Sequence, residues 1–421
     1  MRATTRLGMV GSFLSLALAA SLLTHRAPLD QLASRPTARP PATLPVPDGD
    51  APSGPTPPAP PPPPPRRRRH GGHRPRPHVT VVMSGDLLWH NTVWESAHED
   101  AVRAGTHRPF DFDPAFAAMD SVVRRADVAI CHEEVPFARD DAHLSNYPVF
   151  AAPPEVAPWI ASMGWDACTT DSNHSIDQGF AGLVRTADLL EHNGVRHVGT
   201  FRTPAERRRP VIVTTRQGVR VGIVGGTYSL NGFSLPPDER WAVSMWDAAN
   251  LIAQAKAAKA AGADIVLVQY HGGDEYSPLP NAAQVALVRR LTASPAVDLV
   301  FAEHVHVVQP ITKVNGKWVV YGMGNMIAQM DTVYPRAYEG ITVRFRFTRS
   351  RRGFRVDRAA YIPTYWNHYA PGQPIRIQRV DRALAHGAPD RARLLEARRM
   401  TRLAVNALAT RGGTTPGLRE R

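Results

Sequence analysis

The part of the sequence that decides the fold class is residues 299–306, Leu299-Val300-Phe301-Ala302-Glu303-His304-Val305-His306. Its apolar first half, preceded by Asp298, predicts a buried strand at 298–302, and a His-x-His pair follows. Because side chains alternate along an extended chain, we expect His304 and His306 to point to the same side. Two imidazoles at a strand end can bind one metal ion or two neighbouring ions, although a single His-x-His pair is also common on ordinary surfaces.

Strand-like and helix-like segments alternate through the body of the chain. Apolar runs predict strands at 79–84, 127–131, 166–170, 195–199, 264–270 and 298–302. Helical spacing predicts helices at 113–125, 179–193, 247–261 and 281–292. Antiparallel pairs are predicted at 211–215 with 219–224, at 307–314 with 317–321 around Asn315-Gly316, and at 340–348 with 353–362. The alternation indicates an α/β domain with antiparallel strands added near its end.

Polar side chains gather where five of these strands end. They are Asp86, His132, Glu133, Glu134, Asp171, Asn173, His174, Asp177, His271, Asp274, Glu275, His304 and His306. In open α/β sheets the carboxyl ends of the strands form the ligand crevice. Mixed nitrogen and oxygen donors suit divalent Zn, Mn or Fe, and the set is large enough for two ions. Two ions can stabilise both the attacking and the leaving oxygen of a phosphoryl transfer. The same centre could hydrolyse an amide.

The N-terminus has the pattern of an export segment. Residues 1–6 are positively charged, 7–23 are apolar, and Ala17-Leu18-Ala19 offers a cleavage site. We therefore expect a signal peptide or an uncleaved membrane anchor within residues 1–27, and the pattern does not choose between them. Either one predicts an exported protein that lies outside the cytoplasm.

The segment after it is dominated by proline. Residues 28–78 include the run Pro61–Pro65, and such a composition favours an extended, disordered linker. We expect the folded domain at 79–379. Residues 380–421 are predicted to form a basic helical tail, with its helix at 389–408.

The net charge of +13 is unevenly distributed along the chain. Residues 1–78 carry a net +8 and residues 380–421 a net +5, whereas residues 79–379 hold 30 basic and 30 acidic side chains. A neutral body argues against a nucleic-acid partner. The run Arg66–Arg69 is either a solvated linker charge or a contact for an anionic membrane or polymer.

The chain has two cysteines, Cys131 and Cys168. Both fall in predicted strands close to the polar strand ends. An exported location permits a disulfide between them, but the sequence favours two buried free thiols.

Six motifs occur in the order typical of one family. They are Met83-Ser84-Gly85-Asp86, Ala126-Asp127 with Glu134, Asn173-His174-Ser175-Ile176-Asp177-Gln178-Gly179, Tyr270-His271-Gly272 with Glu275-Tyr276, His304-Val305-His306, and Tyr321-Gly322-Met323-Gly324-Asn325. Over 79–330 the chain resembles the CapA capsule-synthesis proteins, which include the poly-γ-glutamate synthesis proteins of the PgsA type. The resemblance implies a calcineurin-like metallophosphoesterase fold, a four-layer α-β-β-α sandwich of two mixed sheets. It also implies membrane anchorage and a role in making or exporting a polymer.

The resemblance also implies roles for individual residues. The implied metal ligands are Asp86, Glu134, Asn173, His271, His304 and His306, with Asp86 and His306 on the first ion, Glu134 bridging, and the other three on the second. His174 takes the place of a general acid that protonates the leaving oxygen, and Asp177 would orient it. Glu275 and Asn325 would line the crevice.

Three positions depart from the phosphoesterase pattern. Leu88 stands where the first motif usually has a histidine, so that His90 substitutes for it or the first metal site is impaired. His132 stands where CapA proteins often have asparagine, as an added ligand or as a plain neighbour of the site. Ser175 stands where phosphoesterases have an acidic residue.

Two functions are compatible with these observations. The first is an extracytoplasmic hydrolase of a phosphoester or γ-glutamyl-type bond that uses two divalent ions and metal-bound hydroxide. The second is a non-catalytic component that binds or exports a polymer and retains a vestigial metal site. The expected partners are an anionic polymer or phosphorylated substrate, the membrane through the N-terminus, and membrane subunits of a capsule synthase.

Overall fold

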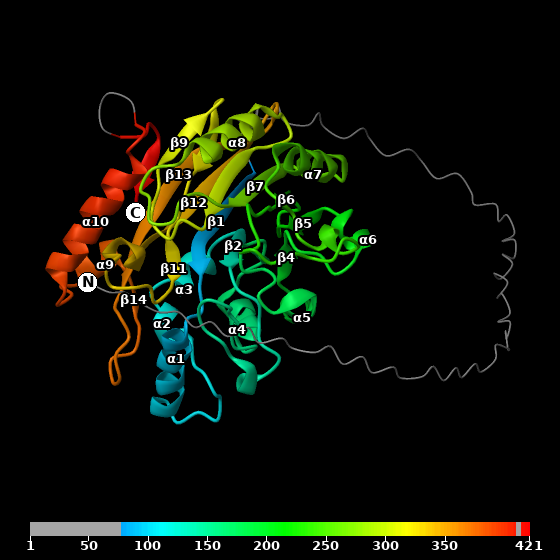
Figure 1. Cartoon of the computed structure of the whole chain (residues 1–421). Coiled ribbons are helices and arrows are strands. Elements are labelled where there is room, and N and C mark those ends of the chain that lie inside the picture. Colours follow the sequence, from blue (N-terminus) through cyan, green and yellow to red (C-terminus); the bar gives the residue numbers. More distant parts are fainter. Residues whose placement is uncertain (1–76, 410–413) are drawn as a thin grey trace, which may run out of the picture. The chain divides into compact units, whose positions relative to one another are not determined.

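The computed structural model describes residues 77–409 and 414–421, which form an α/β unit with two mixed sheets (Figure 1). The export segment predicted at 1–27 and nearly all of the linker predicted at 28–78 lie outside the described residues. Among the residues that are described, no helix is long and apolar enough to span a bilayer.

The large sheet has nine strands in the order β14-β13-β12-β1-β2-β3-β4, with β11 beside β1 and β15 beside β13. Its parallel half is β1 (His78–Leu87), β2 (Val128–Glu133), β3 (Ala167–Thr169) and β4 (Arg196–Val198), and β11 (Asn325–Ile327) also runs parallel to β1. Its antiparallel half is β12 (Glu339–Ser350), β13 (Gly353–Trp366) and β14 (Ile377–Arg379).

The small sheet has six strands in the order β5-β6-β7-β8-β10-β9. They are β5 (Val211–Thr214), β6 (Arg220–Val224), β7 (Ile265–His271), β8 (Leu299–Glu303), β9 (Ile311–Val314) and β10 (Lys317–Val320). The strands from β6 to β10 in this order are parallel, and the two edge strands are antiparallel.

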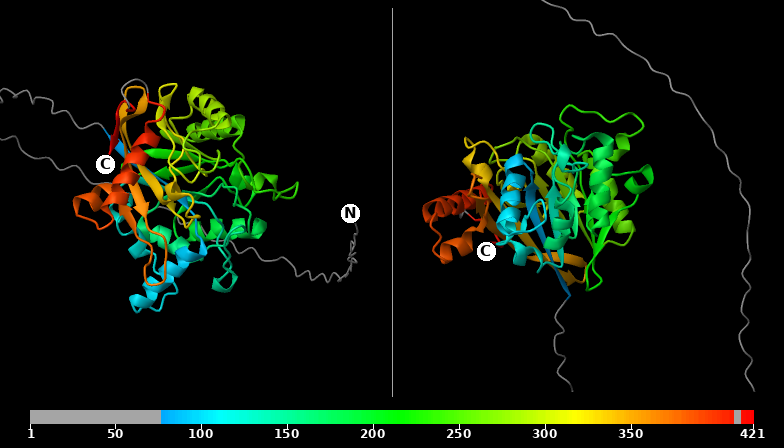
Figure 2. Two further views of the ribbon diagram at one scale, coloured as in Figure 1. Left: turned by 60° about the vertical axis from the view of Figure 1, so that its left-hand side comes forward. Right: turned by 90° about the horizontal axis from the view of Figure 1, so that it is seen from below.

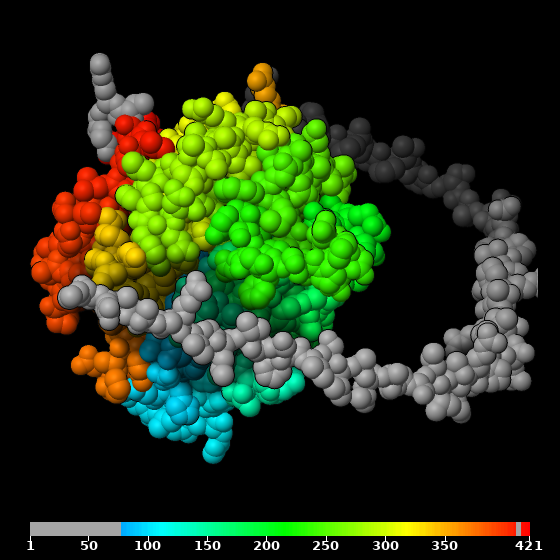
Figure 3. Space-filling model, viewed as in Figure 1, coloured from blue at the N-terminus to red at the C-terminus, as the bar shows by residue number. Residues whose placement is uncertain are grey.

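Three apolar cores define four layers. The middle core joins the inner faces of the two sheets, for example Ile130 of β2 with Leu267 of β7. The helices α1 (Asn91–Arg103), α4 (Val156–Met163) and α5 (Gly179–His192) cover the outer face of the large sheet. The outer face of the small sheet is covered by α7 (Ala248–Ala260) and α8 (Ala282–Ala293), which form much of the surface seen in Figure 3. The predicted α-β-β-α sandwich is confirmed.

Local chemistry explains why the predicted helices begin and end where they do. Asp247 caps α7 by accepting a hydrogen bond from the backbone of Asn250, and Asn281 forms a capping box at the start of α8. Gly194, with φ of 82°, follows the end of α5. Asn315 and Gly316, both with positive φ, form the predicted turn between β9 and β10.

The helix predicted at 113–125 is divided in the structure. Two short helices, α2 (Asp113–Phe116) and α3 (Asp120–Val123), replace it. The backbone N–H of Met119 bonds to the carbonyl of Phe116 at 2.8 Å, and such i to i+3 bonds tighten the chain between the two helices. The apolar side chains of both short helices lie in the core on the outer face of the large sheet.

The C-terminal segment packs on the edge of the large sheet. The helix predicted at 389–408 corresponds to α10 (Arg391–Val405), which follows α9 (Val380–Ala385). Both helices contact β13, and Figure 2 shows them in orange and red along one side. The chain then returns as β15 (Leu418–Glu420), parallel to β13, a strand that the sequence pattern did not indicate.

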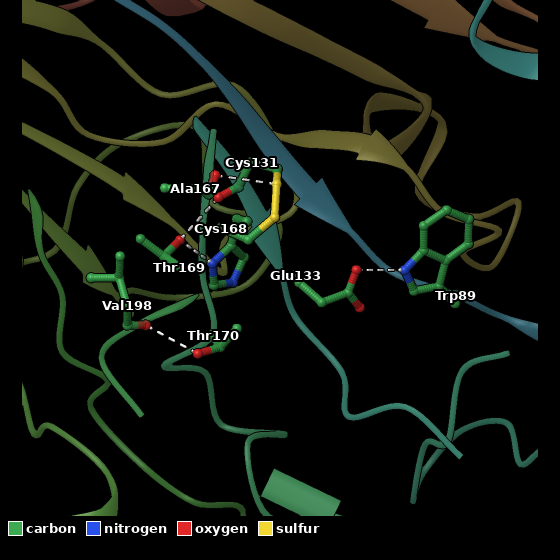
Figure 4. Close-up of a disulfide and its surroundings, with 9 residues drawn as sticks. Trp89, Cys131, Glu133, Ala167, Cys168, Thr169, Thr170 and Val198 are labelled. Carbon is green, nitrogen blue, oxygen red and sulfur yellow. Dashed lines mark hydrogen bonds between the residues drawn. A yellow bond between two sulfur atoms is a disulfide. The ribbon is translucent and has the colours of Figure 1, made fainter. Parts of the chain in front are cut away.

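The preference for two free thiols is wrong. Cys131 and Cys168 form a disulfide between β2 and β3 (Figure 4). The two residues are direct partners in the parallel register, with their Cα atoms 4.5 Å apart. The register of two parallel strands depends on the tertiary fold, so it could not be obtained from the cysteine spacing.

Reduction of this disulfide should lower the free energy of unfolding by about 2–4 kcal/mol, because the bond closes a loop across a sequence separation of 37 residues. Urea unfolding with and without dithiothreitol measures the difference. The Cys131→Ala/Cys168→Ala variant is the control and should unfold at the same urea concentration under both conditions. Equal stability of the oxidised and reduced wild-type protein would contradict the prediction.

Candidate metal centre

The predicted ligand residues come together where the parallel strands of both sheets end. Asp86 is the next-to-last residue of β1, and Glu134 follows β2 directly. Asn173 follows β3, His271 ends β7, and His304 follows β8. All five side chains are buried. The fold therefore delivers two carboxylates, an amide and imidazoles to one place.

The extended chain expected at the His-x-His pair is not found. Strand β8 ends at Glu303, and His304 and His306 both have left-handed backbone conformations, with φ of 96° and 56°. The two rings still meet, with centroids 6.0 Å apart. Positive φ is uncommon outside glycine and tends to occur at functional sites. The side chains are therefore brought together by a turn and not by alternation along a strand.

Glu134 lies between two groups of ligand atoms. Its Oε1 is 3.8 Å from Nε2 of His271 and 3.9 Å from Nε2 of His306. One group is Glu134, His271 and His304, and the other is Asp86, Glu134 and His306; within each group the ligand atoms lie within 4.8 Å of one another. A carboxylate shared by both groups has the position that a bridging ligand requires.

The group formed by Asp86, Glu134 and His306 contains a charged hydrogen-bond network. Nδ1 of His306 donates to Oδ2 of Asp86 at 3.1 Å and to Oδ1 of Asn325 at 2.9 Å. Burial on its own would lower the pKa of His306. The charge of Glu134 and the hydrogen bond to Asp86 outweigh burial and raise that pKa to about 10. Burial raises the pKa of Glu134 well above its usual value, so in the protein chain alone the proton on His306 mainly accompanies the carboxylate of Asp86.

In the group formed by Glu134, His271 and His304, both histidines are neutral, and a side-chain amide holds His271. Nε2 of His271 donates to Oδ1 of Asn173 at 2.6 Å, and Nδ2 of Asn173 donates to Asn231 at 3.0 Å. Burial lowers the pKa of both His271 and His304 well below the usual value. Both imidazoles are therefore neutral, the form in which histidine binds metals.

His132 and Glu275 lie within reach of the same ligands. The ligand atoms of Asp86, His132 and His271 lie within 4.8 Å of one another, as do those of Glu275, His304 and His306. Nδ1 of His132 is hydrogen-bonded to the hydroxyl of Thr169 at 2.8 Å, and burial lowers the pKa of His132 to about 4. The Glu275 side chain is exposed, so it borders the centre from the solvent side.

His90 belongs to none of the ligand groups found in the described residues. Its Nδ1 accepts a hydrogen bond from the backbone of Gln329 at 3.3 Å, and its ring packs edge-on against Phe150. Leu88 is buried, and its backbone N–H bonds to the carbonyl of Ile327. The substitution of His90 for the missing histidine is therefore not found, and the buried, apolar Leu88 occupies the position of that histidine in the phosphoesterase pattern.

A histidine–carboxylate pair lies beside the ligand groups. Nδ1 of His174 donates to Oδ2 of Asp177 at 2.7 Å, and the same oxygen accepts from the backbone N–H of Phe150 at 2.7 Å. The ring of Phe150 packs edge-on against His174. Asp177 thereby fixes the ring orientation, and Nε2 remains on the opposite side of the ring, where it can hold a proton.

Two residues that hold these side chains escaped the sequence analysis. Asn231 bonds to Asn173 and reaches the His174 ring, and Phe150 covers that ring and holds Asp177. Both lie in irregular segments without periodicity, and Asn231 has a positive φ. No local pattern in the sequence identifies them.

Gly85 explains why the first motif needs a glycine. A Cβ atom there would lie 1.7 Å from the carbonyl oxygen of Gly324. The neighbouring backbone N–H of Asp86 donates to that same carbonyl at 3.2 Å. The close approach fixes Asp86 against the strand that carries Asn325.

The residues present fit divalent cations. Five buried polar atoms at the centre have no hydrogen-bond partner among the described residues: Oε1 and Oε2 of Glu134, Nε2 of His132, Nδ1 of His271 and Nδ1 of His304. Unpaired buried polar atoms are costly, and all five are metal-ligand atoms. Nitrogen and carboxylate donors in this mixture suit Zn, Mn or Fe.

The full-length protein should bind about two divalent ions per chain, and His271→Ala should lower the metal content by one. His306→Ala should remove the other ion, because the two residues belong to different ligand groups. Elemental analysis after gel filtration measures both losses. His192→Ala, on the exposed side of α5, is the control and should retain the full content. A wild-type content in His271→Ala would refute the assignment.

The chain is similar in sequence to bacterial capsule synthesis proteins. A family model described as bacterial capsule synthesis protein PGA_cap matches residues 80–330. The chain is 25% identical over 251 residues to the PGA biosynthesis protein CapA of Bacillus subtilis, covering 57% of this chain and 61% of that protein. It is 24% identical over 282 residues to the capsule biosynthesis protein CapA of Bacillus anthracis, covering 65% of each. The match thus spans less than two thirds of these relatives.

Solved structures give weaker likenesses. The calcineurin-like phosphoesterase YfkN of Bacillus subtilis has a TM-score of 0.40 and 14% identity, covering 77% of this chain and 100% of that one. A putative 5′-nucleotidase of Staphylococcus aureus has a TM-score of 0.45 and 13% identity, covering 77% and 58%.

Proposed function

Since the chain belongs to the PGA_cap family of bacterial capsule synthesis proteins, we propose that it is a metal-dependent hydrolase that acts outside the cytoplasm on a capsule-type polymer. The bond cleaved is a phosphoester or a γ-glutamyl-type amide. The observation that carries the proposal is the His174–Asp177 pair, which lies next to Asn173 and hence next to the ligand group of His271.

Different side chains would have different roles in such a reaction. The two ligand groups would hold divalent ions, which would supply Lewis-acid stabilisation of charge that develops on oxygen. His174 holds a proton at Nε2 for the leaving oxygen or nitrogen, and Asp177 stabilises the charged ring. Asn231 orients the amide of Asn173 toward His271. Phe150 limits the access of water to His174.

A second candidate is a non-catalytic protein that binds the polymer during synthesis or export. The buried Leu88 at the usual ligand position favours it, because it leaves the first ion with fewer imidazoles. A polymer-binding protein, however, has no need of a buried histidine held by a carboxylate beside a metal site. We therefore place hydrolysis first.

The proposal also covers the location of the protein, its partner and its substrate. The charged and apolar N-terminal pattern supports export, with a signal peptide or an anchor at 1–27. The names of the relatives support a role in capsule biosynthesis. We further propose a membrane-associated synthase as partner and an anionic polymer such as poly-γ-glutamate as substrate. The nature and number of the metal ions belong to the same proposal.

His174→Ala should lower kcat about 100- to 10,000-fold through loss of proton transfer, without loss of bound metal. Turnover of a p-nitrophenyl phosphodiester and of poly-γ-glutamate, measured beside elemental analysis, tests this. Asp177→Asn should show an intermediate loss, and His192→Ala should match the wild type. A fully metallated wild-type protein that cleaves neither substrate would favour the binding function, and so would an active His174→Ala variant.

A further inference from the structure

A basic cavity lies at the start of β1, away from the metal centre. Its volume is about 470 Å³, and five arginines line it: Arg344 and Arg346 of β12, Arg358 of β13, and Arg419 and Arg421 at and after β15. Among the described residues that line it, Asp357 is the only one with an acidic side chain. We call this feature the arginine pocket.

Strand pairing places these arginines close together on one face of the large sheet. Arg346 is the direct partner of Arg358, and Ala360 is the direct partner of both Arg344 and Arg419. Direct partners have Cβ atoms about 5 Å apart, and alternate residues along a strand are about 7 Å apart. Like charges placed opposite each other destabilise a sheet. Folding alone therefore does not explain this arrangement.

Four of the five guanidinium groups in the arginine pocket form no direct ion pair with another described residue. Asp357 pairs with Arg346, with Nε 2.9 Å from Oδ1. For the other four guanidinium groups, no ion pair or hydrogen bond is present within 77–409 and 414–421. Burial lowers the pKa of Arg344; the positive charges of Arg421 and Arg125 lower it further, and the charge of Asp127 raises it.

We propose that the arginine pocket binds a polycarboxylate chain. A guanidinium group binds a carboxylate through two parallel hydrogen bonds. One small anion cannot reach four guanidinium groups spread over about 10–15 Å, whereas a chain with repeated carboxylates can. The lining contains no Phe, Tyr or Trp on which nucleic-acid bases could stack. The choice of an acidic capsule-type polymer rests on the proposed function.

The arginine pocket is separate from the metal centre. Thr80 lines the pocket and Asp86 belongs to the centre, six residues further along β1, which is about 20 Å. A chain bound in the pocket is therefore held away from the place where a bond would be cleaved. The pocket retains the polymer while the centre acts on a different part of it.

The test measures binding of fluorescein-labelled poly-γ-glutamate to the full chain by fluorescence anisotropy at low salt. Arg358→Glu/Arg419→Glu should weaken binding roughly tenfold or more, because both side chains are exposed and each loses a charge-assisted contact. Arg108→Glu/Arg290→Glu makes the same change of net charge at exposed sites elsewhere and should stay within about twofold. Arg358→Gln/Arg419→Gln, a milder change, should weaken binding less and guards against misfolding.

Binding and hydrolysis are separable in this experiment. His271→Ala should bind the polymer like the wild type even where turnover is lost, so failure of the hydrolase proposal leaves this one standing. Unchanged affinity in Arg358→Glu/Arg419→Glu, or no binding by the wild type, would overturn it. An oligonucleotide of equal charge that binds as tightly, with the same sensitivity to the two changes, would overturn the polycarboxylate assignment.

Discussion

The structure depends on the burial of two carboxylates, Asp86 and Glu134, in a space with few donors. An ionised carboxylate away from water is unstable unless a positive charge or several hydrogen bonds accompany it. His306 meets this need in the protein chain by holding a proton, with its pKa raised to about 10. Nδ1 of His271 and Nδ1 of His304 have no hydrogen-bond partner among the described residues, and both atoms can bind a cation. The side chains of the centre are thus suited to bind metal ions, and the ends of β1, β2, β7 and β8 position them.

The two sheets share the task of building this centre. The large sheet supplies Asp86 and Glu134 from adjacent parallel strands, and the small sheet supplies His271 and the turn with His304 and His306. The core between the sheets fixes their separation. The contact of Gly85 with Gly324 and the disulfide between β2 and β3 stabilise the large-sheet side. Tertiary packing therefore sets the distances on which metal binding depends.

The sequence predicted the features that arise from local chemistry. Apolar spacing predicted α5, α7 and α8, and Asn315-Gly316 predicted its hairpin. Polar residues at strand ends predicted which side chains would meet. The register of Cys131 with Cys168, the left-handed turn at His304 and the position of Asn231 were not predictable. Each of these depends on contacts between segments far apart in the chain, which leave no periodic pattern.

The position of the positive charge in the folded structure also depends on contacts between segments far apart in the sequence. Division of the sequence into segments assigned the excess positive charge to the two ends and left the body neutral. The fold then returns Arg419 and Arg421 to the body through β15, beside Arg344 and Arg358. The net charge of a sequence segment does not tell where its charged side chains lie in the folded structure. A neutral domain can therefore carry a buried acidic centre at one end of β1 and a basic pocket at the other, about 20 Å apart.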